Sequence, residues 1–167
     1  LYVASQNGHV GAMTVLIKVK AAVNQARNDG ATPLFIASQN GDVEAMKVLI
    51  KAKAAVDQAN NNGATPLFIA SQNGDVEAMK VLIKAKAEVN QARNDGATPL
   101  LIASRYGHAP AVQVLLEAGA CSAELMYEGK VSPLHVAADQ GHLECVRLLT
   151  GFRPNTAAWN TFLVGAK

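Results

Sequence analysis

The densest group of residues that could do chemistry lies near the end of the 167-residue chain. The stretch "HVAADQGHLEC" holds His135, Asp139, His142, Glu144 and Cys145. His135 and Asp139 are four residues apart, so a helix would place both side chains on one face. Such a pair could bind a metal ion or form a dyad for proton transfer.

The remainder of the sequence offers no further catalytic motif. It contains no Gly-rich phosphate loop, no nucleophile elbow and no Glu-x-x-His pair. Cys121 and Cys145 form neither a CxxC pair nor a metal-type spacing, so we expect no disulfide framework and no metal site. Low cysteine usage and the lack of a recognisable signal peptide favour the cytoplasm or the nucleus.

The composition sets further bounds on function. Half of the residues are apolar but only 5% are aromatic, and alanine is abundant. A core of small side chains packs helices closely and builds few large pockets. The formal net charge of +2 is too small to indicate a nucleic-acid partner. No apolar run approaches the roughly 18 residues that span a bilayer.

The elements that must position these residues recur along the chain. The stretch "GATPLFIASQNG" occupies residues 30–41 and returns unaltered at residues 63–74. Residues 29–61 and 62–94 differ at only four of 33 positions, which indicates tandem duplication. We therefore divide the chain into five units, 1–28, 29–61, 62–94, 95–128 and 129–155, followed by a capping helix or tail at 156–167.

Each unit predicts two short helices and a loop. Thr32 suits an N-cap position and Pro33 the first position of a helix that ends at Gly41. Asp42 can cap a second helix, and the run "AVDQANNNGA" predicts a hairpin-like loop. Alanines at positions 37, 45 and 52 would let neighbouring helices approach closely. Helices this short are not stable alone, so stacking of the units must supply the core.

This pattern resembles the ankyrin repeat family. The resemblance rests on "SPLHVAADQGHLECVRLL" at 132–149 and on "GATPLLIASRYGHAPAVQVLLEAGA" at 96–120. It implies an all-α repeat solenoid in which helix-turn-helix units are joined by hairpin loops within a single elongated, curved domain. His135 and His142 then occupy the family's two histidine positions, which bond to loops, and Cys145 takes a packing position. We expect no enzyme activity, no metal and no cofactor.

One departure from the family concerns the end of the second helix. The family's glycine at this point is Lys20, Lys53 and Lys86 in this chain, and glycine returns at Gly119. A lysine held in the left-handed conformation would cost about 1 kcal/mol relative to glycine. The positive charge at a helix C-terminus could offset that cost.

The resemblance also implies a function. The family binds partner proteins through its hairpin tips and first helices, so we expect a noncatalytic, monomeric protein-binding module whose partner the sequence does not identify. Arg105 and Tyr106 interrupt a run of repeated amides with residue types that dominate binding hot spots. The candidate contact residues are Arg27, Asp29, Gln39, Asn40, Asn60, Asn62, Gln72, Asn73, Arg93, Asp95, Arg105, Tyr106 and Asp139.

Two other functions are compatible with the sequence. Lysines recur in pairs with the 33-residue period, and stacking would align them into a stripe that could bind nucleic acid or anionic lipid. Acidic residues recur as well and no aromatic residues interleave, so a solvated face is the simpler interpretation. The alternative to any binding role is a purely structural spacer. The stripe consists of Lys18, Lys20, Lys51, Lys53, Lys84 and Lys86.

A modification is also conceivable. Asn24 and Asn90 follow valine at the position that asparagine hydroxylases modify in some ankyrin repeats.

Overall fold

The computed structural model of the protein describes residues 1–121 and 131–151, and all its regular elements there are helices. The helices follow one another in pairs along the chain: α1 (Tyr2–Gln6), α2 (Val10–Lys18), α3 (Pro33–Gln39), α4 (Val43–Lys51), α5 (Pro66–Asn73), α6 (Val76–Lys84), α7 (Pro99–Arg105), α8 (Ala109–Glu117), α9 (Pro133–Asp139) and α10 (Leu143–Gly151).

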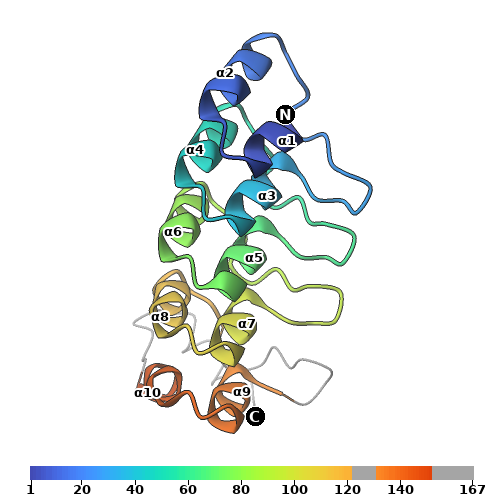
Figure 1. The fold of residues 1–167 in the computed structure, drawn as a ribbon. Helices are drawn as coiled ribbons and strands as arrows, with labels where there is room; N and C mark the ends of the chain where they lie inside the picture. Colours follow the sequence, from blue (N-terminus) through green and yellow to red (C-terminus); the bar gives the residue numbers. More distant parts are fainter. Residues whose placement is uncertain (122–130, 152–167) are drawn as a thin grey trace, which may run out of the picture.

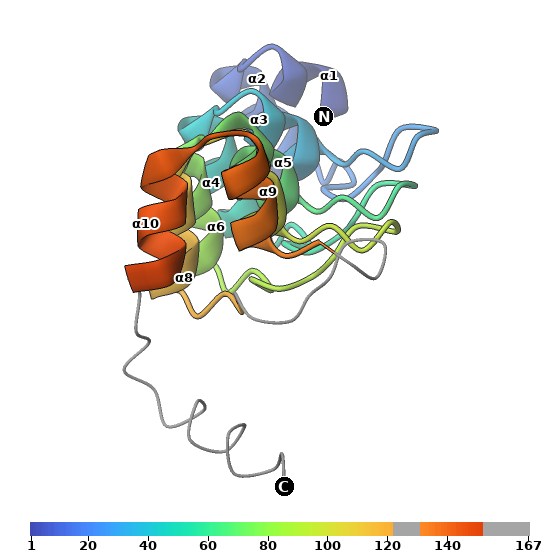
Figure 2. The ribbon, with the colours of Figure 1, turned by 90° about the horizontal axis from the view of Figure 1, so that it is seen from below.

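The helix pairs stack into an elongated array of two layers (Figure 1). The first helices α1, α3, α5, α7 and α9 pack side by side, and the second helices α2, α4, α6, α8 and α10 form the other layer. The loops that join the first four units project to one side as hairpins, away from the layer of second helices (Figure 2). The predicted all-α repeat solenoid is confirmed. The predicted cap or tail at 156–167 lies outside the described residues.

The first helices begin as the sequence predicts. Thr32 Oγ1 accepts a hydrogen bond from the backbone N–H of Phe35 at 3.1 Å, and Pro33 takes the first turn. The corresponding hydroxyls cap α5, α7 and α9 in the same way. Asp42 caps α4, since its Oδ1 lies 3.0 Å from the amide nitrogen of Ala45. These bonds satisfy N–H groups that a helix leaves without partners.

In the first four units, a residue with left-handed backbone follows the second helix. This residue is lysine in the first three units, with φ of 62° at Lys20, 67° at Lys53 and 69° at Lys86. Gly119 takes the same place in the fourth unit with φ of 88°. Three lysines therefore adopt a conformation that glycine adopts more readily.

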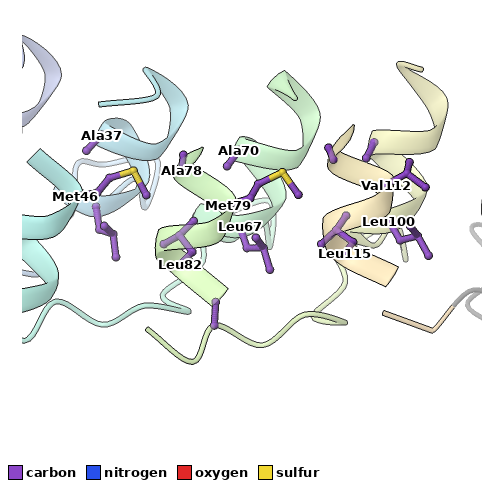
Figure 3. Close-up of a cluster of buried hydrophobic side chains, with 14 of the residues drawn as sticks. Ala37, Met46, Leu67, Ala70, Ala78, Met79, Leu82, Leu100, Val112 and Leu115 are labelled. Carbon is purple, nitrogen blue, oxygen red and sulfur yellow. The ribbon is translucent and has the colours of Figure 1, made fainter. Parts of the chain in front are cut away.

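The main core lies between the two layers (Figure 3). Ala37, Ala45 and Met46 are fully buried there, and equivalent residues repeat along the stack. Ala52 is half-buried at the C-terminal end of α4 and does not belong to this buried core. Small alanines let the helices approach while methionine and leucine fill the remaining space.

A second, smaller cluster lies beneath the hairpins. It contains Phe35, Phe68 and Leu101, with Tyr2 packed against it. Adjacent hairpins are joined above this cluster, because Asn61 Nδ2 donates to the backbone oxygen of Asn28 at 2.9 Å. Residues of this cluster also line the candidate binding groove.

Candidate partner-binding face

The residues that suggested chemistry each have a separate structural partner. His135 Nδ1 lies 2.8 Å from Ser132 Oγ, and Asp139 accepts a hydrogen bond from Gln140 at 2.8 Å. His142 Nε2 donates to the backbone oxygen of Arg105 in the preceding unit at 3.0 Å. The histidines therefore bond to neighbouring backbone and cap groups, as the resemblance implied.

Cys145 is fully buried, and burial raises the pKa of its thiol, with a smaller contribution from the charge of Glu144. A buried thiol that holds its proton is a poor nucleophile. Within residues 1–121 and 131–151, no three His, Cys, Asp or Glu side chains are grouped closely enough to hold a metal ion.

A groove of about 280 Å³ lies beside the first helices and the hairpins of the first three units. Apolar residues that are themselves largely buried form its floor, namely Ala31, Phe35, Ala64, Phe68 and Ile69, with Tyr2 beside them, while most of the accessible lining is polar. Seven of the predicted contact residues line it, namely Arg27, Asp29, Gln39, Asn60, Asn62, Gln72 and Arg93.

An arginine–aspartate pair forms one end of the groove. Arg27 Nε lies 3.0 Å from Asp29 Oδ1, and the guanidinium carbon lies 5.4 Å from the centre of the Tyr2 ring. The hydrogen bond from Arg27, helped by that from the Ala31 N–H, lowers the pKa of Asp29 to about 2. Asp29 is therefore ionised at neutral pH and already engaged.

A second pair repeats this arrangement two units later. Arg93 Nε lies 3.0 Å from Asp95 Oδ1, and the guanidinium carbon lies 5.0 Å from the centre of the Phe68 ring. The hydrogen bond from Arg93 lowers the pKa of Asp95. Arg93 borders the groove, whereas Asp95 does not line it.

Two of the predicted contact residues hold the units together. Asn40 Nδ2 donates to the backbone oxygen of Gln6 at 2.8 Å, and Asn73 Nδ2 donates to that of Gln39 at 2.8 Å. In the next unit, His108 Nε2 makes the equivalent bond to the oxygen of Gln72 at 2.9 Å. The amide hydrogens of Asn40 and Asn73 are thus partly committed to neighbouring units.

The last three predicted contact residues lie outside the groove lining. Tyr106 is 52% exposed and stacks on His108 with 6.2 Å between ring centres. Arg105 and Asp139 are exposed at the ends of α7 and α9. The structure therefore gathers seven of the predicted contact residues around one groove and leaves these three further along the stack.

The aromatic floor is the part of the site that the list of predicted residues omits. Tyr2, Phe35 and Phe68 recur at the 33-residue period in the sequence, which was a detectable signal. The contacts of Tyr2 with Arg27 and of Phe68 with Arg93 depend on how each hairpin folds back over its own first helix.

Comparison with known families agrees with this architecture. A family described as ankyrin repeats (three copies) matches residues 1–93 and 87–158. The chain belongs to the ankyrin repeat family. Members of this family are in general noncatalytic modules for protein–protein interaction. No curated protein shows significant sequence similarity to the chain.

The ankyrin stack also brings the six stripe lysines onto the ends of α2, α4 and α6, and each is exposed. Among the described residues, the lysines that form ion pairs are Lys47 with Glu44 and Lys80 with Glu77, and neither belongs to the stripe. None of the stripe lysines lines the groove. No helix in the described part of the chain combines the length and the apolar character needed to cross a membrane.

The two asparagines considered for hydroxylation connect neighbouring ankyrin units. Asn24 Oδ1 accepts from the N–H of Ala55 at 2.9 Å, and Asn90 Oδ1 accepts from that of Cys121 at 3.0 Å. Hydroxylation of either residue stays a prediction, which a one-oxygen mass gain on its peptide would test.

Proposed function

We propose that this ankyrin repeat array binds a partner protein on the concave face formed by its hairpin tips and first helices. The observation that supports the proposal best is the groove, which combines an apolar floor with a rim of amide and paired charged groups. A stable interface needs apolar contact surrounded by polar groups that fix orientation. The array needs no catalytic chemistry for this role.

We further propose that Arg105 and Tyr106 extend this face beyond the groove. Both are exposed, and units two and three present nearly identical residues that would let one partner dock in shifted registers. A residue pair that differs from the repeat can select one register. The remaining predicted contact residues would supply hydrogen bonds around it.

The test begins with affinity purification of the partner using the full chain. Replacing Arg105 and Tyr106 together by alanine should weaken binding at least tenfold, because the variant loses an arginine and an aromatic anchor. A matched control is Lys80→Ala, on the exposed face of α6. Unchanged affinity in the double variant, with an unchanged circular dichroism spectrum, would show that this part of the face is misplaced.

The lysine stripe supports a second candidate function, because six exposed lysines lie at the ends of stacked helices. Binding of nucleic acid or anionic lipid through the stripe would weaken steeply as salt rises. Replacing Lys51 and Lys53 by glutamine should then reduce the salt dependence. A purely structural spacer would capture no partner at any salt concentration.

A further inference from the structure

The hairpin of the middle unit lacks the arginine that the hairpins on either side of it carry. Positions 27, 60 and 93 are equivalent across three units, as are the ring positions 2, 35 and 68. Arg27 lies over Tyr2 and Arg93 lies over Phe68, with guanidinium carbons 5.4 and 5.0 Å from the ring centres. The middle unit has Asn60 where the others have arginine.

Asn60 does not replace the missing guanidinium. Its Oδ1 accepts hydrogen bonds from the backbone N–H groups of Asn62 and Ala64, each at 3.0 Å. The short side chain is thus held against its own hairpin, where it performs the backbone-binding role that Asp29 performs toward Ala31. It offers no cation to the ring of Phe35.

The groove reaches Phe35, which is 6% exposed. The groove borders Phe35, Asn60 and Asn62 at this point, and its volume is about 280 Å³. That volume is at the lower limit of pockets for whole small-molecule ligands, which begin at about 300 Å³, and suits a side chain.

We propose that this middle position binds an arginine side chain of the partner protein, with its guanidinium over the ring of Phe35. This inference rests on the proposed function, and it names the chemistry that the groove selects. The face of an aromatic ring attracts a cation, and a planar guanidinium stacks on it while donating hydrogen bonds from its edge. Gln39, Asn62 and Gln72 line the groove, and an amide side chain has an oxygen that can accept such a bond.

The charges around the opening favour this occupant over an acidic one. Arg27 holds Asp29 and Arg93 holds Asp95, so each flanking arginine is already paired with a carboxylate. An acidic side chain would therefore meet arginines whose charge is already balanced by a carboxylate. An arginine would meet an aromatic ring and neutral amide oxygens. Arg27 and Arg93 of this chain likewise lie over aromatic rings.

The experiment introduces an arginine into the middle unit of the chain itself, at the position where the proposed arginine of the partner would bind. Replacing Asn60 by arginine and Asn62 by aspartate copies the Arg93–Asp95 pair of the next unit onto a nearly identical unit. The probe is acetyl-Gly-Arg-Gly-amide, titrated into the isotope-labelled full chain while NMR signals of Phe35 and Asn62 or its replacement are followed. We expect saturable shifts in the original chain with a millimolar Kd, and binding at least tenfold weaker in the filled variant.

A matched peptide tests the charge. Acetyl-Gly-citrulline-Gly-amide replaces the guanidinium by an uncharged urea of similar shape, and we expect it to bind at least tenfold more weakly. Absence of saturable shifts with the arginine peptide, or equal binding by the filled variant or the citrulline peptide, would overturn the inference. An unchanged thermal unfolding curve establishes that the filled variant is folded.

A second variant tests the same idea in the opposite direction. Replacing Arg93 and Asp95 by asparagine should uncover Phe68 and create a second set of saturable shifts there; its absence would count against the inference. The purified partner separates the two proposals. A partner that binds the original and filled chains equally would refute the arginine subsite alone, whereas failure to capture any partner would refute the proposed function while the peptide titration still decides the subsite.

Discussion

The lysines that end the second helices combine an unfavourable backbone with a favourable charge. Lys53, with φ of 67°, has a Cβ atom in a conformation that crowds the following carbonyl. Its ammonium group lies near the negative end of the α4 dipole, which offsets part of that cost. The balance between these effects can be measured at this one residue.

Replacing Lys53 by glycine should raise the free energy of unfolding by about 1 kcal/mol, because glycine adopts a positive φ without the Cβ contact. Urea unfolding followed by circular dichroism measures the change. Lys53→Ala is the matched control, since it removes the charge but keeps Cβ, and it should be no more stable than the original chain. Equal stability of the two variants would contradict backbone strain as the cause.

The carboxylate of Asp29 reports on its pair with Arg27. Replacing Arg27 by glutamine should return the pKa of Asp29 from about 2 toward its ordinary value of 3.8, because the hydrogen bond from the Arg27 guanidinium is the largest cause of the lowered pKa. Carbon-detected NMR titration measures this, and Asp95, with Arg93 intact, should keep its lowered pKa. A lowered folded pKa stabilises the fold above about pH 4, and that stabilisation is lost as pH falls through about 2. An unchanged Asp29 pKa in the variant would be inconsistent with the pairing.

At the scale of elements, the hairpins are held together by their backbones. The N–H of Asn61 donates to the oxygen of Asp29 at 2.9 Å, and that of Asn94 donates to the oxygen of Asn62 at 3.0 Å. Such close approach leaves no room for a side chain at Gly63, where a Cβ atom would lie 2.2 Å from Asn94 Oδ1 and 2.7 Å from its backbone nitrogen. The glycine is therefore required by the neighbouring hairpin as well as by its φ of 81°.

Gly63→Ala should lower the free energy of unfolding by about 3 kcal/mol, from a backbone clash added to the strain of a positive φ. Gly119→Ala is the control, because its φ is 88° but no atom of the described residues lies within 4 Å of the added Cβ. It should cost about 1 kcal/mol. Chemical denaturation of both variants measures the difference, and similar losses would show that the hairpin contact contributes little.

At the scale of the whole molecule, packing is between neighbours. The largest contacts between units join consecutive first helices, namely α1 to α3, α3 to α5, α5 to α7 and α7 to α9, and consecutive second helices make smaller contacts. Stability of such an array is approximately the sum of the units and their interfaces. A whole unit can therefore be removed without disturbing the contacts of distant ones.

Deleting residues 62–94 should leave a folded, shorter and less stable array, because residues 29–61 present nearly the same surface to the fourth unit. The denaturant m-value should fall by roughly one fifth, as the surface exposed on unfolding falls with length. Deleting residues 62–77 instead should abolish cooperative unfolding, since it leaves half a unit. Equal behaviour of the two deletions would contradict modular packing.

Local spacing in the sequence determined the fold, since the period, the Thr32 cap, the Asp42 cap and the turn glycines act within a few residues of one another. The resemblance to ankyrin repeats placed His135 and His142 at the two histidine positions of that family. Because these effects are local, they can be predicted before any tertiary contact is known. The lysine substitutions were also visible, although their positive φ required the structure.

Tertiary structure alone decided which of the repeated polar residues remain open to a partner. Asn40 bonds to a unit 34 residues away in sequence, and the guanidinium of Arg27 rests on Tyr2 only because the hairpin folds back over the first helix. Asn60 likewise bonds to the backbone of its own hairpin, which only the folded hairpin brings about. The contacts of Asn40 and Arg27 join residues that are far apart in the sequence, so local spacing does not predict them. They form only because the hairpins fold back and one unit stacks on the next.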